Sequence, residues 1–489
     1  MFSIKRERLK RELKGVDSYE EWKGLAKKLD TANGLEAWKR NDQSHKFDYK
    51  EIRRRLDKLR KYRQSGDDHA LLFTLNEGIH GNMGGMGNPQ LYNHALFGTK
   101  DVIVDYVEEI ANSLLHIVST QNEEITMEEK IDFFSRASHC FGRSALMLSG
   151  GGQLGNFHMG VIKALCEQKL LPNIISGSSA GSIFAALVGT FTDEELATYF
   201  EPKNLMMELE VETKMMSLFR QRTQVKSEDL AETLDRIIPN LTFHEAFEKT
   251  GRKINISVAP YESNQKSRLL NAIASPNVLI HSAVMASCAI PGIFKPVTLL
   301  AKNKDGVVKE YLPDRQWVDG SMSNDLPSKR LTRLYMTNHF IVSLTNPFII
   351  PFVNDKAQKN NFLNAATKFG KAIIQETTQF NYAVAKPFFK YWPRLANVAS
   401  NLNSVVQQDY TGDINIVADF SVVSPHNLLT PLTQEELTAL IRKGEQATWP
   451  KIENIRVTTL VGRLLDSILD EYGRQGIEVL SKQAELEDA

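Results

Sequence analysis

The chain has 489 residues, of which 42% are hydrophobic and 24% charged, a composition typical of globular proteins and unlike that of a disordered chain. Lys plus Arg and Asp plus Glu each total 59, so the formal charge is zero and gives no reason to expect a nucleic-acid partner. The three cysteines are widely spaced and predict neither a disulfide framework nor a zinc site, which favours a reducing, cytoplasmic compartment.

Residues 1–143 are predicted to form an α-helical N-terminal domain. Apolar residues recur every three or four positions over residues 18–62, and again over 102–116 and 127–139. Dense charge lies between them, so each stretch predicts an amphipathic helix.

The first 70 residues carry 20 basic and 13 acidic side chains. This basic arm either binds anionic lipid headgroups or is only a solvated surface. The N-terminus becomes charged after four residues, and no window reaches the roughly 18–20 apolar residues that span a bilayer. We therefore expect any contact with a membrane or lipid surface to be peripheral.

From Ser144 the pattern changes to short apolar runs, glycines and helical periodicity, which predicts an α/β domain over 144–345. Strands and helices are expected at Ala145–Leu148, Phe157–Gln168, Ile174–Ser176, Ser182–Gly189, Ile254–Ala259 and Phe340–Leu344. After about Thr345 the signal weakens. Residues 346–489 are expected to form a mostly helical C-terminal extension that includes an amphipathic stretch at Ile455–Tyr472.

The strongest local motif is Gly177-Ser178-Ser179-Ala180-Gly181, a G-x-S-x-G between a predicted strand and a predicted helix. A nucleophile elbow requires this context, because the sharp turn brings backbone too close for side chains at the two glycines. Ser179 is thus predicted to be a nucleophile.

Upstream, Gly150, Gly151 and Gly152 begin the loop GGGQLG, again between a strand and a helix. Such a loop can direct backbone N–H groups at a developing oxyanion. The string also satisfies the dinucleotide-binding pattern G-x-G-x-x-G, but that fold expects an acidic residue about 20 positions on, where this chain has Ile174, Ile175 and Ser176. An oxyanion loop is the preferred interpretation.

Two kinds of base could activate the serine. An ordinary α/β-hydrolase would use a later histidine, and His339 and His426 are available. His339 lies in an apolar stretch and His426 in a polar turn, so both are expected to be structural. The alternative is Asp319, at a predicted strand end in WVDGS, since burial can raise the basicity of a carboxylate. Asp325 in SNDLP is a second candidate, in a setting typical of a turn or helix cap.

Together, GGGQLG, GSSAG about 25 residues later, and DGS about 140 residues after the serine resemble the patatin-like phospholipase family. ASCAIPGIFKPV at 286–297 also matches a stretch typical of that family. WKGLAKKLD, LLFTLNEGIHGNMGGMGNPQLYNHALFGTK and YTGDINIV at 410–417 resemble its triacylglycerol lipase branch, known from plant oil bodies and yeast lipid particles.

The resemblance implies a three-layer α/β sandwich with a mainly parallel sheet. It implies a Ser179–Asp319 dyad without catalytic histidine, an oxyanion hole from the glycine loop, and no metal or organic cofactor. We expect a serine acyl hydrolase of glycerolipids that favours triacylglycerol. A phospholipase A-type hydrolase and a non-catalytic lipid-binding protein are the alternatives.

The chain departs from the family pattern at two places. Many members have a basic residue in the glycine loop, where this chain has Gln153 and Leu154, so backbone amides must suffice. The aspartate is followed by Gly320 and Ser321 in place of the commoner Gly-Gly or Gly-Ala. Serine is small and should leave the aspartate undisturbed.

Overall fold

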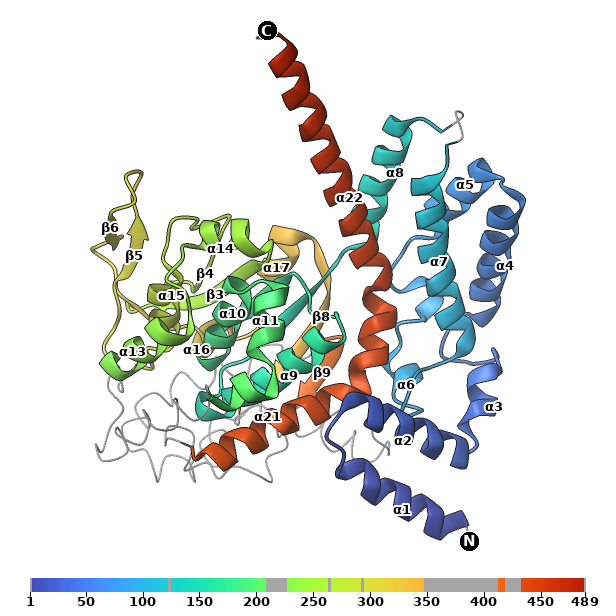
Figure 1. Cartoon of the computed structure of the whole chain (residues 1–489), viewed down its shortest axis with the longest axis horizontal. Helices are drawn as coiled ribbons and strands as arrows, with labels where there is room; N and C mark the ends of the chain where they lie inside the picture. The colour runs from blue at the N-terminus through green and yellow to red at the C-terminus, as the bar shows by residue number, and fades with distance from the viewer. Residues whose placement is uncertain are drawn as a thin grey trace. The chain divides into compact units, whose positions relative to one another are not determined.

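The computed structural model describes residues 2–121, 125–207, 227–262, 265–291, 294–346, 412–417 and 432–487 (Figure 1). The chain divides into two compact units. Unit 1 comprises Met1–Ser144, Leu334–His339 and Pro450–Ala489, and unit 2 comprises Ala145–Arg333 and Phe340–Trp449.

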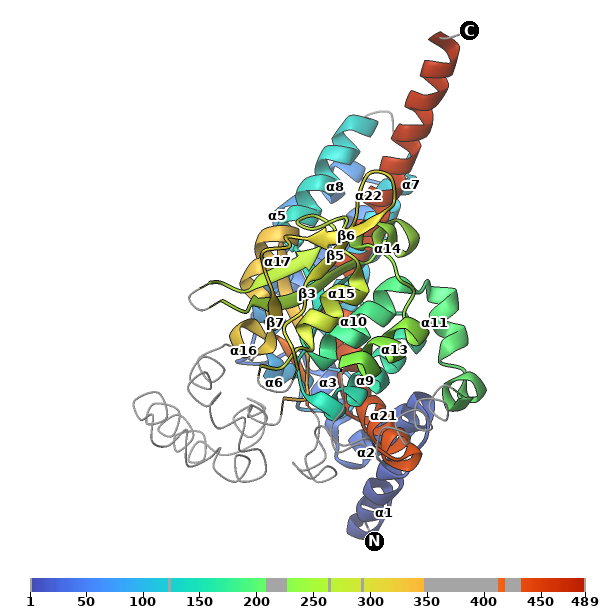
Figure 2. The ribbon, with the colours of Figure 1, turned by 90° about the vertical axis from the view of Figure 1, so that its left-hand side faces the viewer.

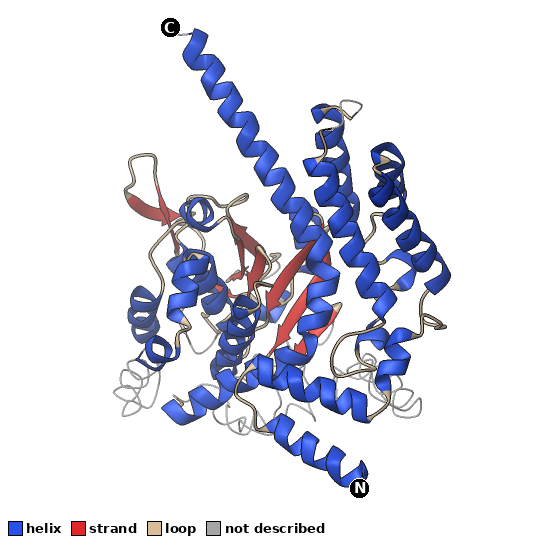
Figure 3. Cartoon of the chain, turned by 45° about the vertical axis from the view of Figure 1, so that its right-hand side comes forward, coloured by secondary structure: helices blue, strands red, loops and turns tan. Residues whose placement is uncertain are grey.

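Unit 1 is helical, as Figure 3 shows by its colour. Its α-helices are α1 (Phe2–Lys14), α2 (Tyr19–Ala32), α3 (Leu35–Arg40), α4 (Tyr49–Ser65), α5 (Asp68–Gly78), α6 (Pro89–Tyr92), α7 (Asp101–Ser119), α8 (Met127–Phe141) and α22 (Ile452–Glu487). A short 3-10 turn, η1 (Met83–Gly85), precedes α6, and another, η7 (Trp449–Lys451), leads into α22. Apolar faces of α4, α5, α7, α8 and α22 meet in one buried core.

Polar residues set where these helices begin. The side chains of Ser18, Asp48 and Asp67 each accept a hydrogen bond from a backbone amide in the first turn of α2, α4 and α5. Thr126 and Glu129 form a capping box at the start of α8. The helical N-terminal part predicted from apolar periodicity is therefore confirmed, and local caps mark where several of its helices begin.

Many charges of the basic arm are neutralised within unit 1. Arg53 pairs with Asp42 at 2.7 Å, Arg63 pairs with Glu109 at 2.6 Å, and Glu51 pairs with both Arg54 and Arg55. Trp22 is buried with 5% exposure. These pairs engage several basic side chains of the arm, although Asp42 and Glu51 already belong to its 13 acidic residues and only Glu109 lies outside it.

Unit 2 is built on a mixed, mainly parallel sheet. Within the described ranges the strand order is β4-β3-β2-β1-β8-β9, and β7 also pairs with β3. The strands are β1 (Arg143–Leu148), β2 (Ile174–Gly177), β3 (Lys253–Pro260), β4 (Arg268–Asn271), β7 (Trp317–Asp319), β8 (Thr337–Leu344) and β9 (Ile414–Val417). β1, β2 and β3 run parallel to one another, as do β8 and β9, whereas β4 and β7 are antiparallel to β3.

Helices cover the sheet. They are α9 (Asn156–Glu167), α10 (Ala180–Thr190), α11 (Asp193–Tyr199), α13 (Ser227–Ile237), α14 (Phe243–Thr250), α15 (Ile280–Ser287), α16 (Ser321–Asn324), α17 (Ser328–Tyr335) and α21 (Gln434–Thr448). A 3-10 turn, η2 (Gly152–Gly155), precedes α9, and β5 (Leu299–Lys302) and β6 (Val308–Tyr311) form a separate hairpin. α10, α14 and α15 pack on β3, and Figure 2 shows α10 and α17 on opposite sides of that strand.

The predicted α/β core is confirmed by β1, α9, β2, α10, β3 and β8, which cover the six expected segments. All four residues of β2 are buried, as in a central parallel strand. The hairpin β5–β6 and the short strands β4 and β9 were not predicted, because four residues carry little periodic signal.

The predicted C-terminal extension, 346–489, is divided between the two units. β9 pairs with β8, and α21 packs closely against α9 in unit 2, where a Cβ at Gly160 would overlap the Ile441 carbonyl. α22 contributes its apolar stripe to the core of unit 1. Residues 347–411 and 418–431 lie outside the described residues. They include His426, the aromatic segment KPFFKYW and all of the segment NPFIIPFVN except its first residue, Asn346.

Candidate active site

Ser179 occupies a strained turn between β2 and α10. Its backbone angles are φ 50° and ψ −125°, a combination that non-glycine residues rarely adopt. A Cβ at Gly177 would overlap the Gly181 carbonyl, and a Cβ at Gly181 would overlap the Leu148 carbonyl. The two glycines are therefore required by close backbone approach, as the predicted elbow demands.

Asp319 ends β7 and lies beside this turn. It is 3% exposed, and hydrogen bonding with the Ser179 side chain acts to lower the pKa of its carboxylate. Its Oδ1 also accepts the Ser321 amide at 2.8 Å. Burial raises the pKa of Asp319 to about 6, against the lowering effect of these hydrogen bonds. The carboxylate is thus a stronger base than an exposed one, yet still ionised at neutral pH.

The glycine loop after β1 contacts the same place. A Cβ at Gly150 would lie 3.3 Å from the Ser179 Cβ and 3.0 Å from the Ser321 Cβ, so any side chain there would crowd both. A Cβ at Gly151 would lie 2.5 Å from Thr345 Oγ1. Gly152 has φ 56°, in the left-handed region that favours glycine.

The prediction that the Gly150 amide is an oxyanion donor needs correction. The Gly150 N–H donates to Asp325 Oδ1 at 2.8 Å, and both groups are buried. This amide is therefore committed to holding the loop and does not point at a reacting ester. Asp325, considered from the sequence as a second base, is instead the anchor of the glycine loop.

A buried histidine that was not predicted as a site residue bonds to the residue before the glycine loop. His158, in the first turn of α9, has Nε2 2.9 Å from the Ser149 carbonyl oxygen and Nδ1 2.7 Å from Ser343 Oγ. A carbonyl only accepts, so Nε2 carries the proton and Nδ1 accepts from the serine. Burial lowers the pKa of His158 to about 4, and the ring is neutral. Its position directly after the glycine loop was the available sequence signal.

The histidine that could complete a triad lies elsewhere. His339 is near the start of β8, where its Nδ1 is 3.0 Å from Ser144 Oγ. Six residues of extended chain, about 20 Å, separate it from Thr345, which contacts the glycine loop. Among the described residues, no hydrogen bond joins a histidine to Ser179, and no three His, Cys, Asp or Glu side chains converge as metal ligands do.

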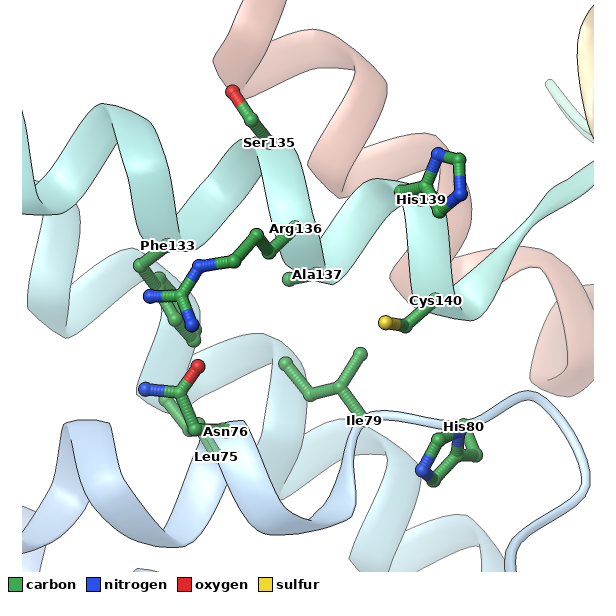
Figure 4. A pocket seen from close by; sticks show the side chains of 10 residues that line it. All are labelled: Leu75, Asn76, Ile79, His80, Phe133, Ser135, Arg136, Ala137, His139 and Cys140. Atoms are coloured by element: carbon green, nitrogen blue, oxygen red, sulfur yellow. The ribbon is translucent and has the colours of Figure 1, made fainter.

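A hollow of about 400 Å³ lies in unit 1 and contains none of these groups (Figure 4). Its apolar lining includes Ile79, the residue after α5, and Phe133 and Ala137 from α8. Arg136 on its rim is paired with Asp132 at 2.9 Å. His80, His139 and Cys140 also line the hollow, but neither Ser179 nor Asp319 does.

Two known families match parts of this chain. Residues 146–331 match the family described as patatin-like phospholipase, and residues 2–139 match a domain of unknown function, DUF3336. The boundary between the two matches falls where the helical unit gives way to β1.

Named relatives extend over most of the chain. Triacylglycerol lipase SDP1L of Arabidopsis thaliana is 32% identical over 92% of this chain and 57% of its own length. Triacylglycerol lipase 5 of Saccharomyces cerevisiae is 33% identical over 90% of this chain and 62% of its own length. This chain thus spans about six tenths of those two relatives. Triacylglycerol lipase ptl3 of Schizosaccharomyces pombe is 32% identical over 91% of this chain and 93% of its own length. With a patatin-like phospholipase match over residues 146–331 and a relative that it matches over 93% of that relative's length, the chain belongs to the patatin-like phospholipase family.

Proposed function

We propose that this protein is a serine acyl hydrolase of glycerolipids, with Ser179 as nucleophile and Asp319 as its general base. The proposal is supported by the strained turn of Ser179, with φ 50°, and by the neighbouring buried carboxylate of Asp319, whose pKa is raised to about 6 by burial. A serine in a strained elbow, bonded to a desolvated base, has the arrangement of an activated nucleophile.

In the proposed reaction, Ser179 Oγ attacks the ester carbonyl while its proton passes to Asp319. The amides of Gly151 and Gly152 stabilise the oxyanion, since that of Gly150 is engaged by Asp325. The carboxyl group then returns the proton to the departing alcohol. Water attacks the acyl-enzyme, gives its proton to Asp319, and releases the fatty acid as Ser179 regains its proton.

The names of the relatives favour triacylglycerol as substrate. Hydrolysis of membrane phospholipids is the second candidate, because the family that matches residues 146–331 is described as patatin-like phospholipase. A non-catalytic lipid-binding role is the third, and it predicts an unreactive Ser179.

Covalent labelling tests the proposal. A fluorophosphonate should modify the chain once, and peptide mass spectrometry should find the adduct on Ser179, because only an activated serine reacts readily. Ser179→Ala should abolish both labelling and release of fatty acid from a mixed emulsion of triolein and phosphatidylcholine. An adduct on Ser178 or Ser182 would contradict the assignment of the nucleophile, and an unlabelled, well-folded protein would favour the non-catalytic role.

We also propose that the protein acts peripherally at a lipid surface, because its substrate class is insoluble. Within the described ranges, no helix combines the length and apolar character that crossing a bilayer requires. The ion pairs of Arg53, Arg54, Arg55 and Arg63 argue against the basic arm as the main anchor. Co-sedimentation with vesicles should accordingly change little between low and high salt. A steep loss of binding with salt would restore the arm as the lipid contact.

A further inference from the structure

The last turn of α15 and the two residues after it bond to the backbone of both proposed dyad residues. The Ser179 N–H donates to Ser287 Oγ at 2.9 Å. The Asp319 N–H donates to the Ala289 carbonyl at 3.0 Å. Ser179 and Asp319 are about 140 residues apart in sequence, so one short segment holds two distant parts of the chain together.

Ser287 makes a second bond that completes the link. Its hydroxyl donates to the Ser257 carbonyl of β3 at 2.7 Å. The same carbonyl abuts Gly320, the residue after Asp319, because a Cβ at Gly320 would overlap it. One hydroxyl therefore connects the Ser179 amide to β3, the strand with which β7 and Asp319 pair.

The setting of this hydroxyl excludes water as a substitute. Ser287 has 0% exposure, and Ser257 and Asp319 are buried around it. Cys288, between the two bonding residues, is also buried, and burial together with the nearby charge of Asp319 raises the pKa of its thiol to about 12. The thiol is therefore neutral, and it lies 3.9 Å from the Ser182 hydroxyl, which donates to the Ser179 carbonyl.

We infer that Ser287 is a positioning residue, which holds the strained Ser179 turn at hydrogen-bonding distance from Asp319. The inference rests on the proposed function and deepens it. Ser287 touches neither the ester nor the carboxylate and acts through the Ser179 amide. Because the turn is strained, losing that bond allows it to relax, and displacements of about 1 Å at a nucleophile cost on the order of 100-fold in rate.

A serine in the same helix provides the matched control. Ser282 lies in α15 and is buried, and its hydroxyl donates to the Leu279 carbonyl at 2.8 Å and accepts the Leu300 amide at 3.0 Å. Ser282→Ala removes one buried hydroxyl from α15, as Ser287→Ala does, but leaves the Ser179 turn intact. Both variants should lose similar stability, so the comparison isolates positioning.

The measurement is the rate of fluorophosphonate labelling of Ser179 in the full chain, followed over pH. Ser287→Ala should slow labelling about 10- to 100-fold, whereas Ser282→Ala should stay within about twofold of wild type. The acid limb of the Ser287→Ala profile should also move to higher pH, because a weaker Ser179–Asp319 hydrogen bond stabilises the carboxylate less.

Ser287→Thr and Ser287→Val form a second pair, because threonine and valine have nearly the same shape and only threonine carries a hydroxyl. This pair tests the positioning role if Ser287→Ala does not fold. Slower labelling of the valine variant supports the inference. Equal rates in this pair, or wild-type labelling with an unchanged acid limb in Ser287→Ala, would overturn it and leave Ser287 a packing residue. A wild-type chain that takes no label on Ser179 would instead refute the proposed function, and this inference with it.

Discussion

Replacing Asp319 with asparagine should inactivate the protein and stabilise it. The carboxyl group is buried, and its pKa is raised from 3.8 to about 6. Above pH 6 the carboxylate of Asp319 is ionised in the folded protein, where burial makes its charge less favourable than it is in the unfolded chain. The wild-type protein loses stability from this group as pH rises from about 4 through about 6, and the loss is complete above that range. At 1.36 kcal/mol per pKa unit the loss amounts to about 3 kcal/mol.

Asparagine carries no charge and resembles the protonated carboxyl group. Asp319→Asn should accordingly be about 3 kcal/mol more stable than wild type at pH 8 and nearly equal to it at pH 4. Removing the general base should slow turnover about 100- to 10,000-fold. Wild-type labelling of Ser179 should rise with pH around a midpoint near 6, where Asp319 becomes ionised.

Urea unfolding at pH 4 and pH 8 measures the stability difference. Ser179→Ala is the control, because it should also be inactive but removes the side chain whose hydrogen bonding lowers the pKa of Asp319. It should destabilise the protein at pH 8, opposite in sign to Asp319→Asn. If Asp319→Asn is no more stable than wild type at pH 8, the carboxylate is not desolvated and the reasoning on its basicity is refuted.

Two further variants probe the surroundings of the site. Asp325→Ala removes the acceptor of the Gly150 amide, so the glycine loop should loosen and ester turnover should fall about tenfold or more with the fold retained; unchanged turnover would contradict the anchoring role. Gly160→Ala places a Cβ against the Ile441 carbonyl and should cost about 1–3 kcal/mol in urea unfolding as α21 is pushed from α9. Gly24→Ala, a helical site with nothing within 4 Å, should be neutral or slightly stabilising, and an equal loss at both sites would exclude the clash as the cause.

The sequence by itself predicted the features that depend on neighbouring residues. β1, the glycine loop, α9, β2 and the Ser179 turn follow one another within about 40 residues. Each is encoded by local means: an apolar run, glycines where backbone approaches backbone, and helical periodicity. The helices of residues 1–143 were predicted for the same reason.

Tertiary structure decided which distant residues meet. Asp319 lies beside Ser179 because β7 pairs with β3, a contact that no local pattern specifies. Asp325, predicted as a cap or a second base, accepts the Gly150 amide, and the hydroxyl of Ser287 links the Ser179 amide to β3. A buried hydrogen bond depends on three-dimensional proximity and leaves no periodic trace in either partner.

The same distinction explains the C-terminal region and the basic arm. The amphipathic pattern predicted a helix over Ile455–Tyr472 but not that α22 completes the core of unit 1 while β9 joins the sheet of unit 2. Likewise, the count of basic residues did not predict that Arg63 pairs with Glu109 or Arg53 with Asp42. An apolar face or a charge in the sequence indicates that another segment should pack against it or pair with it. Only the folded chain determines which segment that is, because folding brings distant segments into contact.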